Sequence, residues 1–287
     1  MNPFEKVIDR ASDNAKIYEE NDYIGDDGLL MCGTCHTRKQ VKVNFLGKEK
    51  IVYCICKCEQ ERVKEEELER ERLKIKVNSE IFRLKAFPDS KDSDPKSEDN
   101  MMNWTFKNDN GKQPKLTAVA KRYVENFETL KSKGQGLLLY GSVGVGKSYI
   151  AACIANALID KGYPVLMTTF ERIEKTSFGM VSGKQDYFDS LNKYPLLILD
   201  DLGTERDTDY MQEIVHTVVN NRSLANLPLI VTTNLTSQQL QNPTGIRNQR
   251  IYSRLLKMCC PIKVEGEDQR KLKAIESFAE TKRLLGL

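Results

Sequence analysis

The sequence predicts an α/β fold over residues 101–287, a parallel β-sheet with helices on both faces, preceded by a small cysteine-rich head and a charged helix. Three observations support this prediction. Short apolar runs rich in Leu, Ile and Val alternate with longer stretches of helical periodicity from Met101 onward. A glycine-rich GxxxxGK(S/T) pattern lies between one such run and the following helix. Five of the eight cysteines fall within residues 32–58.

Five apolar segments are predicted to be the strands of this sheet. They are GLLLY (136–140), PVLMTT (164–169), LLILD (196–200), LPLIVTT (227–233) and PIKVE (261–265). Apolar residues at helical spacing predict helices over 113–133, 147–161, 170–179, 208–225, 247–258 and 268–285. Because strands and helices alternate, the connections are crossovers and the strands run parallel.

Composition excludes several classes of protein. The 287 residues are 40% hydrophobic and 30% charged, which is the balance of a globular chain rather than a disordered one. No apolar run approaches the roughly 20 residues that span a bilayer, and the N-terminus lacks the apolar core of a signal peptide. We therefore expect a cytoplasmic protein that makes no membrane contact. The net charge of +3 does not indicate nucleic-acid binding by itself, but it allows a local basic track.

The chain is predicted to have three parts: a head over 1–58, a charged helix and linker over 59–100, and the α/β domain over 101–287. In the head, VKVNFL (41–46) and KIVYCIC (50–56) alternate like two short strands. Residues 59–77 carry charges of both signs, which is typical of a solvated helix that is either a spacer or a binding site for a partner. Proline and polar residues over 88–100 indicate the linker.

The clustered cysteines have the spacing of a structural zinc site. Cys32 and Cys35 form a CxxC knuckle, in which Gly33 allows the turn, and Cys54, Cys56 and Cys58 follow. Four thiolates suffice for tetrahedral zinc, so one thiol is in excess, and reduced cysteines without metal remain the alternative. The neighbouring His36 is expected to be exposed and His216 to be structural. The remaining cysteines, Cys153, Cys259 and Cys260, lie in apolar segments and are expected to be buried.

The glycine-rich pattern predicts a phosphate-binding loop. It spans Gly141 to Ser148, follows an apolar strand and opens a helix, so backbone N–H groups and the helix N-terminus face an anion. Lys147 is expected to reach the β- and γ-phosphates of ATP, and the Ser148 hydroxyl to bind Mg²⁺. A glycine-rich turn without a ligand is the alternative. The predicted nucleotide-binding residues are Gly141, Ser142, Val143, Gly144, Val145, Gly146, Lys147, Ser148, Tyr149 and Asp200.

Polar side chains end the next two strands. Asp200 is placed to hold Mg²⁺ directly or through water, and Asp201 to polarise the attacking water. Asn234 follows the strand IVTT and could hydrogen-bond both that water and the γ-phosphate. The alternatives are that the carboxylates cap the next segment and that the amide caps a turn.

Three arginines are candidates for stabilising charge during hydrolysis. Arg250 and Arg254 are four residues apart and share one helix face, so one could reach the γ-phosphate of a neighbouring subunit. Arg270 begins the last predicted helix and could reach the nucleotide of its own chain. Surface salt bridges are the alternative for all three.

Together, these motifs resemble the AAA+ ATPase superfamily, and more narrowly the DnaC/DnaI-type helicase loaders and the related IstB ATPases. The resemblance covers about 101–285: GSVGVGKS resembles Walker A, LLILDDLG Walker B, IVTTN sensor 1, RIYSR the arginine-finger box and GEDQR sensor 2. It implies an AAA+ P-loop three-layer sandwich and catalytic roles for Lys147, Asp201, Asn234, Arg254 as the finger, and Arg270. The family more often has Glu at the second Walker B carboxylate, which leaves the hydrolysis rate open.

The resemblance also implies partners and a zinc ligand set. Loaders of the DnaI kind, including phage and prophage versions, carry CxxC…CxC heads, which favours Cys32, Cys35, Cys56 and Cys58, with Cys54 in reserve. It implies an ATP-dependent oligomer that binds the hexameric replicative DNA helicase and single-stranded DNA. The MNWTF segment resembles the lead-in to the ATPase core, so Trp104 and Phe106 are expected near the nucleotide or as anchors of the linker.

Three other functions fit parts of the sequence. An IstB-like transposition helper would bind duplex DNA and a transposase, but the zinc head favours the loader. A zinc adaptor would hold ATP only as a structural ligand, and DNA-stimulated turnover would argue against it. A monomeric P-loop kinase leaves Asn234, Arg254 and Arg270 unexplained.

Overall fold

A computed structural model describes residues 19–45, 47–88, 94, 97, 99–180, 182–203 and 208–287. The chain divides into two compact units, residues 1–74 and 75–287. No described helix combines the length and apolarity that crossing a bilayer requires. The predicted linker over 88–100 falls mostly outside the described residues.

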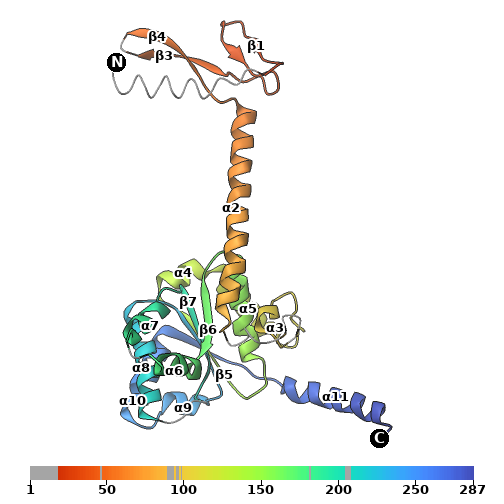
Figure 1. The fold of residues 1–287 in the computed structure, drawn as a ribbon, viewed down its shortest axis with the longest axis vertical. Helices are drawn as coiled ribbons and strands as arrows, with labels where there is room; N and C mark the ends of the chain where they lie inside the picture. The colour runs from red at the N-terminus through yellow and green to blue at the C-terminus, as the bar shows by residue number, and fades with distance from the viewer. Residues whose placement is uncertain are drawn as a thin grey trace. The chain divides into compact units, whose positions relative to one another are not determined.

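The second unit is built on a five-stranded sheet (Figure 1). Its strands are β5 (Gly136–Tyr140), β6 (Val165–Thr169), β7 (Leu196–Leu202), β8 (Leu229–Thr233) and β9 (Cys259–Lys263), in the spatial order β6-β7-β8-β5-β9. All four pairings are parallel, as predicted. The strand β9 begins two residues earlier than expected, because Cys259 and Cys260 pair with Gly136 and Leu137.

Side chains alternate between the two faces of the sheet along each strand, and each face carries its own apolar layer. Leu137 and Leu139 join one core cluster, with Ala120 from α3 (Pro114–Glu125) and Ile154 from α5 (Lys147–Asp160). Leu138 points to the opposite face. There it meets side chains from α6 (Phe170–Phe178), α7 (Lys184–Leu191), α8 (Asp209–Leu224) and α10 (Ile246–Met258). Helices therefore cover both faces of the sheet, which is the predicted three-layer arrangement.

The predicted helices are present with corrected boundaries. The stretch 113–133 is two helices, α3 and α4 (Phe127–Ser132), because Asn126 ends α3 with its backbone N–H and its side chain both bonded to the Arg122 carbonyl. The last helix is α11 (Gln269–Leu285). Three short helices were not predicted: the 3-10 helix η2 (Met101–Asn103), α7 and α9 (Ser237–Gln241). A capping box between Thr236 and Gln239 begins α9, and T-x-x-Q was its signal in the sequence.

The charged helix is longer than predicted. It is α2 (Lys57–Ala86), which begins in the first unit and ends in the second. Its last turns continue past Val77 because they are part of the second unit, where Ala86 is fully buried and Phe82 contacts the core. Arg83 forms an ion pair with Asp160 of α5.

The head contains two small antiparallel pairs. One is β1 (Tyr23–Ile24) with β2 (Leu30–Met31), which was not predicted, and the other is the predicted hairpin of β3 (Gln40–Phe45) and β4 (Lys48–Tyr53). The expected second strand, KIVYCIC, began two residues too late and ended three residues too late, because β4 starts at Lys48 and ends at Tyr53 before the second group of cysteines.

Candidate functional site

The predicted phosphate loop lies between β5 and α5, and its backbone requires glycine. Gly144 has a φ of 77°. A Cβ there would lie 1.9 Å from Oδ1 of Asp268, the residue that caps α11. The backbone N–H of Gln269 donates to the Gly144 carbonyl at 2.9 Å. The first turn of α11 therefore packs directly on the loop.

Lys147 connects the loop to the end of a different strand. Its Nζ donates to the carbonyls of Gly141 at 3.0 Å and Ser142 at 2.6 Å, and to Oδ1 of Asn234 at 2.7 Å. Burial lowers the pKa of Lys147, while the charges of Asp201 and Asp200 act in the opposite direction. The structure thus brings together two of the residues that the sequence singled out.

The two consecutive carboxylates have different surroundings. Asp200 is buried, accepts a hydrogen bond from Thr232 Oγ1 at 2.5 Å and lies near Ser148. Burial raises its pKa. Asp201 lies at a register shift of β7 with a φ of 58°, a left-handed conformation that Asp tolerates. The shift turns Asp201 toward the cavity, while Asp200 stays beside Ser148, where both could hold a Mg²⁺ ion.

A cavity of about 830 Å³ unites most of the predicted nucleotide-binding residues. The phosphate loop from Val143 to Tyr149 lines it, and Asp201, Asn234 and Arg270 contribute side chains. Polar residues before α3, which the sequence analysis did not single out, also line the cavity. These are Ser97, Asp99, Asn103, Asn108, Asp109, Asn110, Lys112 and Gln113.

The two aromatic residues of the lead-in segment have different positions. Trp104 lines the cavity, and its ring centroid lies 5.7 Å from that of Tyr149. Phe106 is not among the lining residues; it packs against the core and lies under Lys121. Both residues pack against the core, and of the two Trp104 is the one at the cavity.

Arg250 and Arg254 lie on α10 and do not line this cavity. Arg254 is half-buried on its helix, and its Nη1 donates to the Arg250 carbonyl at 3.4 Å. Burial, followed by the charges of Arg254, Arg250 and Arg247, lowers the pKa of His216 on α8. Of these three arginines, Arg247 forms an ion pair with Asp209 at 2.7 Å.

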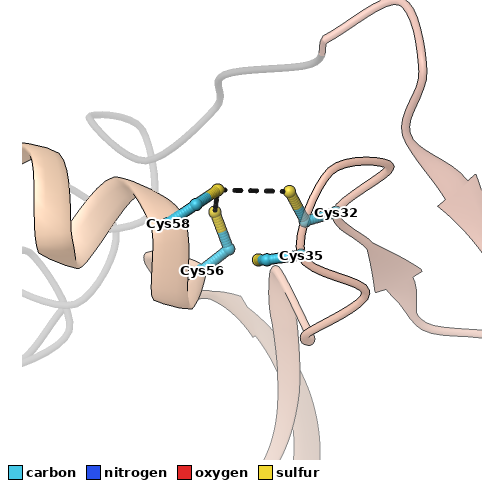
Figure 2. A group of neighbouring side chains, drawn as sticks. All are labelled: Cys32, Cys35, Cys56 and Cys58. Atoms are coloured by element: carbon cyan, nitrogen blue, oxygen red, sulfur yellow. Dashed lines mark hydrogen bonds between the residues drawn. The ribbon is translucent and has the colours of Figure 1, made fainter.

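Four cysteines of the head form the candidate metal centre. The sulfur atoms of Cys32, Cys35, Cys56 and Cys58 all lie within 4.8 Å of one another. Figure 2 shows the first pair on the knuckle loop and the second pair at the start of α2, with their sulfur atoms turned together. A hydrogen bond with Thr37 is the main cause that lowers the pKa of Cys35 to about 5. Four adjacent thiols of this kind can hold a tetrahedral metal ion.

The other cysteines and His36 lie outside this cluster. Cys54 donates to the Arg38 carbonyl at 3.4 Å, and His36 Nδ1 lies 3.2 Å from the Tyr23 hydroxyl. Cys153 and Cys259 are buried as predicted. The prediction for Cys260 was wrong: it is exposed, because residues alternate across the edge strand β9.

Comparison with known proteins identifies the family. The sequence model of the family described as IstB-like ATP binding protein matches residues 63–277. The chain belongs to this family. Together with the sheet topology and the phosphate loop, membership confirms the predicted AAA+ type of P-loop fold.

Individual relatives are replication proteins. The chain is 30% identical to the replicative helicase loader DnaI of Bacillus subtilis (strain 168) over 54% of this chain and 52% of that protein. It is 26% identical to the replicative helicase loader DnaC of Escherichia coli (strain K12), over 50% and 58% respectively. The chain thus spans about half the length of the curated relatives it matches. A solved DnaI structure aligns at 30% identity over 56% of this chain and 86% of that one, with a TM-score of 0.46.

Proposed function

We propose that this chain is an ATP-dependent loader of a replicative DNA helicase, with ATPase activity in residues 101–287. The observation that carries the proposal is the 30% identity to the loader DnaI over 168 residues. Both relatives named above are helicase loaders, which favours this role over a transposition helper. A loader acts on helicase and DNA in the cytoplasm.

ATP is the proposed substrate of the cavity. Backbone N–H groups of Gly144 and Gly146 would face the phosphates, and Lys147 would exchange its bond to Asn234 for the β- and γ-phosphate oxygens. Asn234, released from Lys147, could then orient the attacking water, while Asp201 accepts its proton. Arg270, at the first turn of α11, would offset the charge of the γ-phosphate.

Two groups of residues in the chain could each hold a metal ion. Ser148 and Asp200 would hold Mg²⁺, which neutralises charge on the phosphate oxygens. Cys32, Cys35, Cys56 and Cys58 would hold Zn²⁺ in the head of residues 1–58, whose small strands offer little apolar core. We assign Zn²⁺ a structural role, because four protein ligands leave no open position.

The remaining groups would serve assembly and partner binding. Arg254 lies outside the cavity of its own chain, which suits an arginine finger that reaches the ATP of a neighbouring copy. An ATP-dependent oligomer formed in this way would bind single-stranded DNA. The head is our candidate for the surface that grips the hexameric helicase, connected to the ATPase domain through the helix and linker of residues 59–100.

A loading assay tests the proposal directly. The replicative helicase of the source organism is mixed with the full chain and ATP on single-stranded circles that carry a labelled oligonucleotide, and strand displacement is measured. We expect displacement to depend on the chain and to fail with Lys147→Ala. Displacement of equal rate without the chain, or binding to duplex DNA and a transposase in place of the helicase, would overturn the loader role.

A further inference from the structure

Both cationic side chains and carboxylates line the cavity. Phosphates would bind near the cations, so the carboxylates cannot all face them. Lys147 and Arg270 lie close enough for their charges to interact. Asp109 lines the same cavity as Tyr149, and after burial, the main cause, its charge helps to raise the pKa of Cys153 to about 12. Asp200 and Asp201 are assigned to Mg²⁺ and the attacking water, whereas Asp109 has neither role and would repel a triphosphate, so its side of the cavity suits the uncharged part of a nucleotide.

Helical geometry separates this side from the phosphates. Tyr149, Cys153 and Asn156 follow one another at intervals of four and three residues, so they share one face of α5. Lys147 is two residues before Tyr149 and points in a different direction. The segment before α3 packs along the shared face, because Asn156 Nδ2 donates to the carbonyls of Met101 and Trp104, each at 2.9 Å.

Two aromatic rings, those of Trp104 and Tyr149, form part of the cavity wall. The Trp104 and Tyr149 rings are tilted by 43° with their centroids 5.7 Å apart, and both line the cavity. The Tyr149 hydroxyl donates to the Thr105 carbonyl at 3.1 Å, which holds its ring in place. Aromatic rings of this kind offer a stacking surface to a nucleobase.

Asp109 is held at the same wall as a hydrogen-bond acceptor. Thr117 Oγ1 donates to its Oδ2 at 2.7 Å, and the Gly111 N–H donates to its Oδ1 at 3.3 Å. An ionised carboxylate accepts about four hydrogen bonds and donates none. Asp109 therefore retains capacity for a donor that enters the cavity.

We propose that Asp109 determines the base specificity of the nucleotide site by accepting a hydrogen bond from the exocyclic amine of adenine, while Trp104 and Tyr149 supply the stacking surface. This inference rests on the proposed ATP-dependent function. It assigns a role to a loop whose sequence, KNDNGKQ, matches none of the motifs that predicted the site.

Nucleotide binding tests this role without requiring hydrolysis. Affinities of the full chain with Mg²⁺ are measured for ATP and for purine riboside triphosphate, which differs from ATP only by lacking the amine. We expect the unaltered chain to bind ATP about tenfold more tightly, the typical effect of one hydrogen bond to a charged group. In Asp109→Ala the two affinities should become equal, with that for purine riboside triphosphate unchanged. Asp109→Asn, whose amide oxygen still accepts, should restore part of the preference.

Asp99→Ala is the matched control, because Asp99 is a second carboxylate that lines the same cavity. It should keep the preference for ATP, and thermal melting should show that Asp109→Ala remains folded. A preference that persists in folded Asp109→Ala, or that disappears in Asp99→Ala, would overturn the inference. A wrong functional proposal would give a different result from a wrong role for Asp109. In that case the unaltered chain would bind neither triphosphate, or would bind both and load no helicase.

Discussion

Lys147 Nζ donates a hydrogen bond to Asn234 Oδ1 at 2.7 Å, which joins the helix after β5 to the end of the adjacent strand β8. The two residues are far apart in the sequence and meet because parallel neighbouring strands end at the same edge of the sheet. In this bond, Asn234 Oδ1 takes the place beside the lysine ammonium group that a phosphate oxygen would take. Nucleotide binding must therefore rearrange both side chains together.

Replacing this lysine should remove nucleotide binding. Lys147→Ala deletes the cation that is surrounded by loop carbonyls and Asn234, so we expect ATP affinity to fall by at least about 100-fold. Titration with a fluorescent ATP analogue measures the change. Lys112→Ala is the control, since Lys112 lines the same cavity but donates to Gln269 at 2.7 Å. Tight binding by Lys147→Ala would refute the assignment of the phosphate loop.

The two Walker B carboxylates should separate binding from turnover. Asp200→Asn removes a charge beside Ser148, so Mg²⁺-dependent ATP binding should weaken. Asp201→Asn leaves that pair intact, so binding should persist while turnover falls by about 100-fold or more, the usual contribution of a general base. Equilibrium binding and phosphate release, measured on the same samples, give both quantities. Equal turnover in Asp201→Asn and the unaltered chain would remove Asp201 from the mechanism.

Arg254 should affect turnover only in assembled protein. In Arg254→Ala we expect ATP binding to be unchanged and turnover to be lost at concentrations where the unaltered chain oligomerises. Arg247→Ala is a matched control on the same helix, because Arg247 is paired with Asp209. Phosphate release, measured across a range of protein concentrations, shows whether turnover by Arg254→Ala is lost where the unaltered chain assembles. Full ATPase activity of Arg254→Ala at every concentration would exclude it as the finger.

The cysteine assignment predicts zinc stoichiometry. Cys54→Ser should keep one zinc per chain, because its sulfur is directed to the Arg38 carbonyl outside the cluster. Cys56→Ser should lose most of the zinc and lower the melting temperature of the head. Atomic emission on dialysed protein measures the metal. Zinc that is retained in Cys56→Ser and lost in Cys54→Ser would reverse the assignment.

The features predicted correctly from the sequence are those that leave a periodic pattern or a motif of fixed spacing. Each strand of the main sheet was found because buried parallel strands are continuous apolar runs, and the phosphate loop was found because its glycines and lysine have a fixed spacing. The cavity wall around Asp109 was not found, because short polar side chains in a loop have no period. The position of Cys260 was missed because an apolar neighbourhood in sequence does not reveal which face of an edge strand is covered.

Arg222 was also missed, and it supports a stability prediction. This arginine is fully buried on α8, and its guanidinium donates to the Tyr194 carbonyl at 2.8 Å and to the Pro228 carbonyl. It thereby ties the segment before β7 to the segment before β8. Burial lowers its pKa to about 10, so it remains charged at neutral pH.

Arg222→Met should destabilise the second unit by about 2–3 kcal/mol, because the carbonyls that accept from the guanidinium, those of Tyr194 and Pro228 among them, lose their donor. Arg222→Lys should have an intermediate effect, since one ammonium group cannot reproduce the two-pronged geometry of a guanidinium. Urea unfolding followed by circular dichroism gives the free energies of unfolding. Arg283→Met, at an exposed position of α11, is the control and should change stability by less than about 0.5 kcal/mol. If Arg222→Met is as stable as this control, the buried guanidinium contributes no net stability, because its desolvation then offsets its hydrogen bonds.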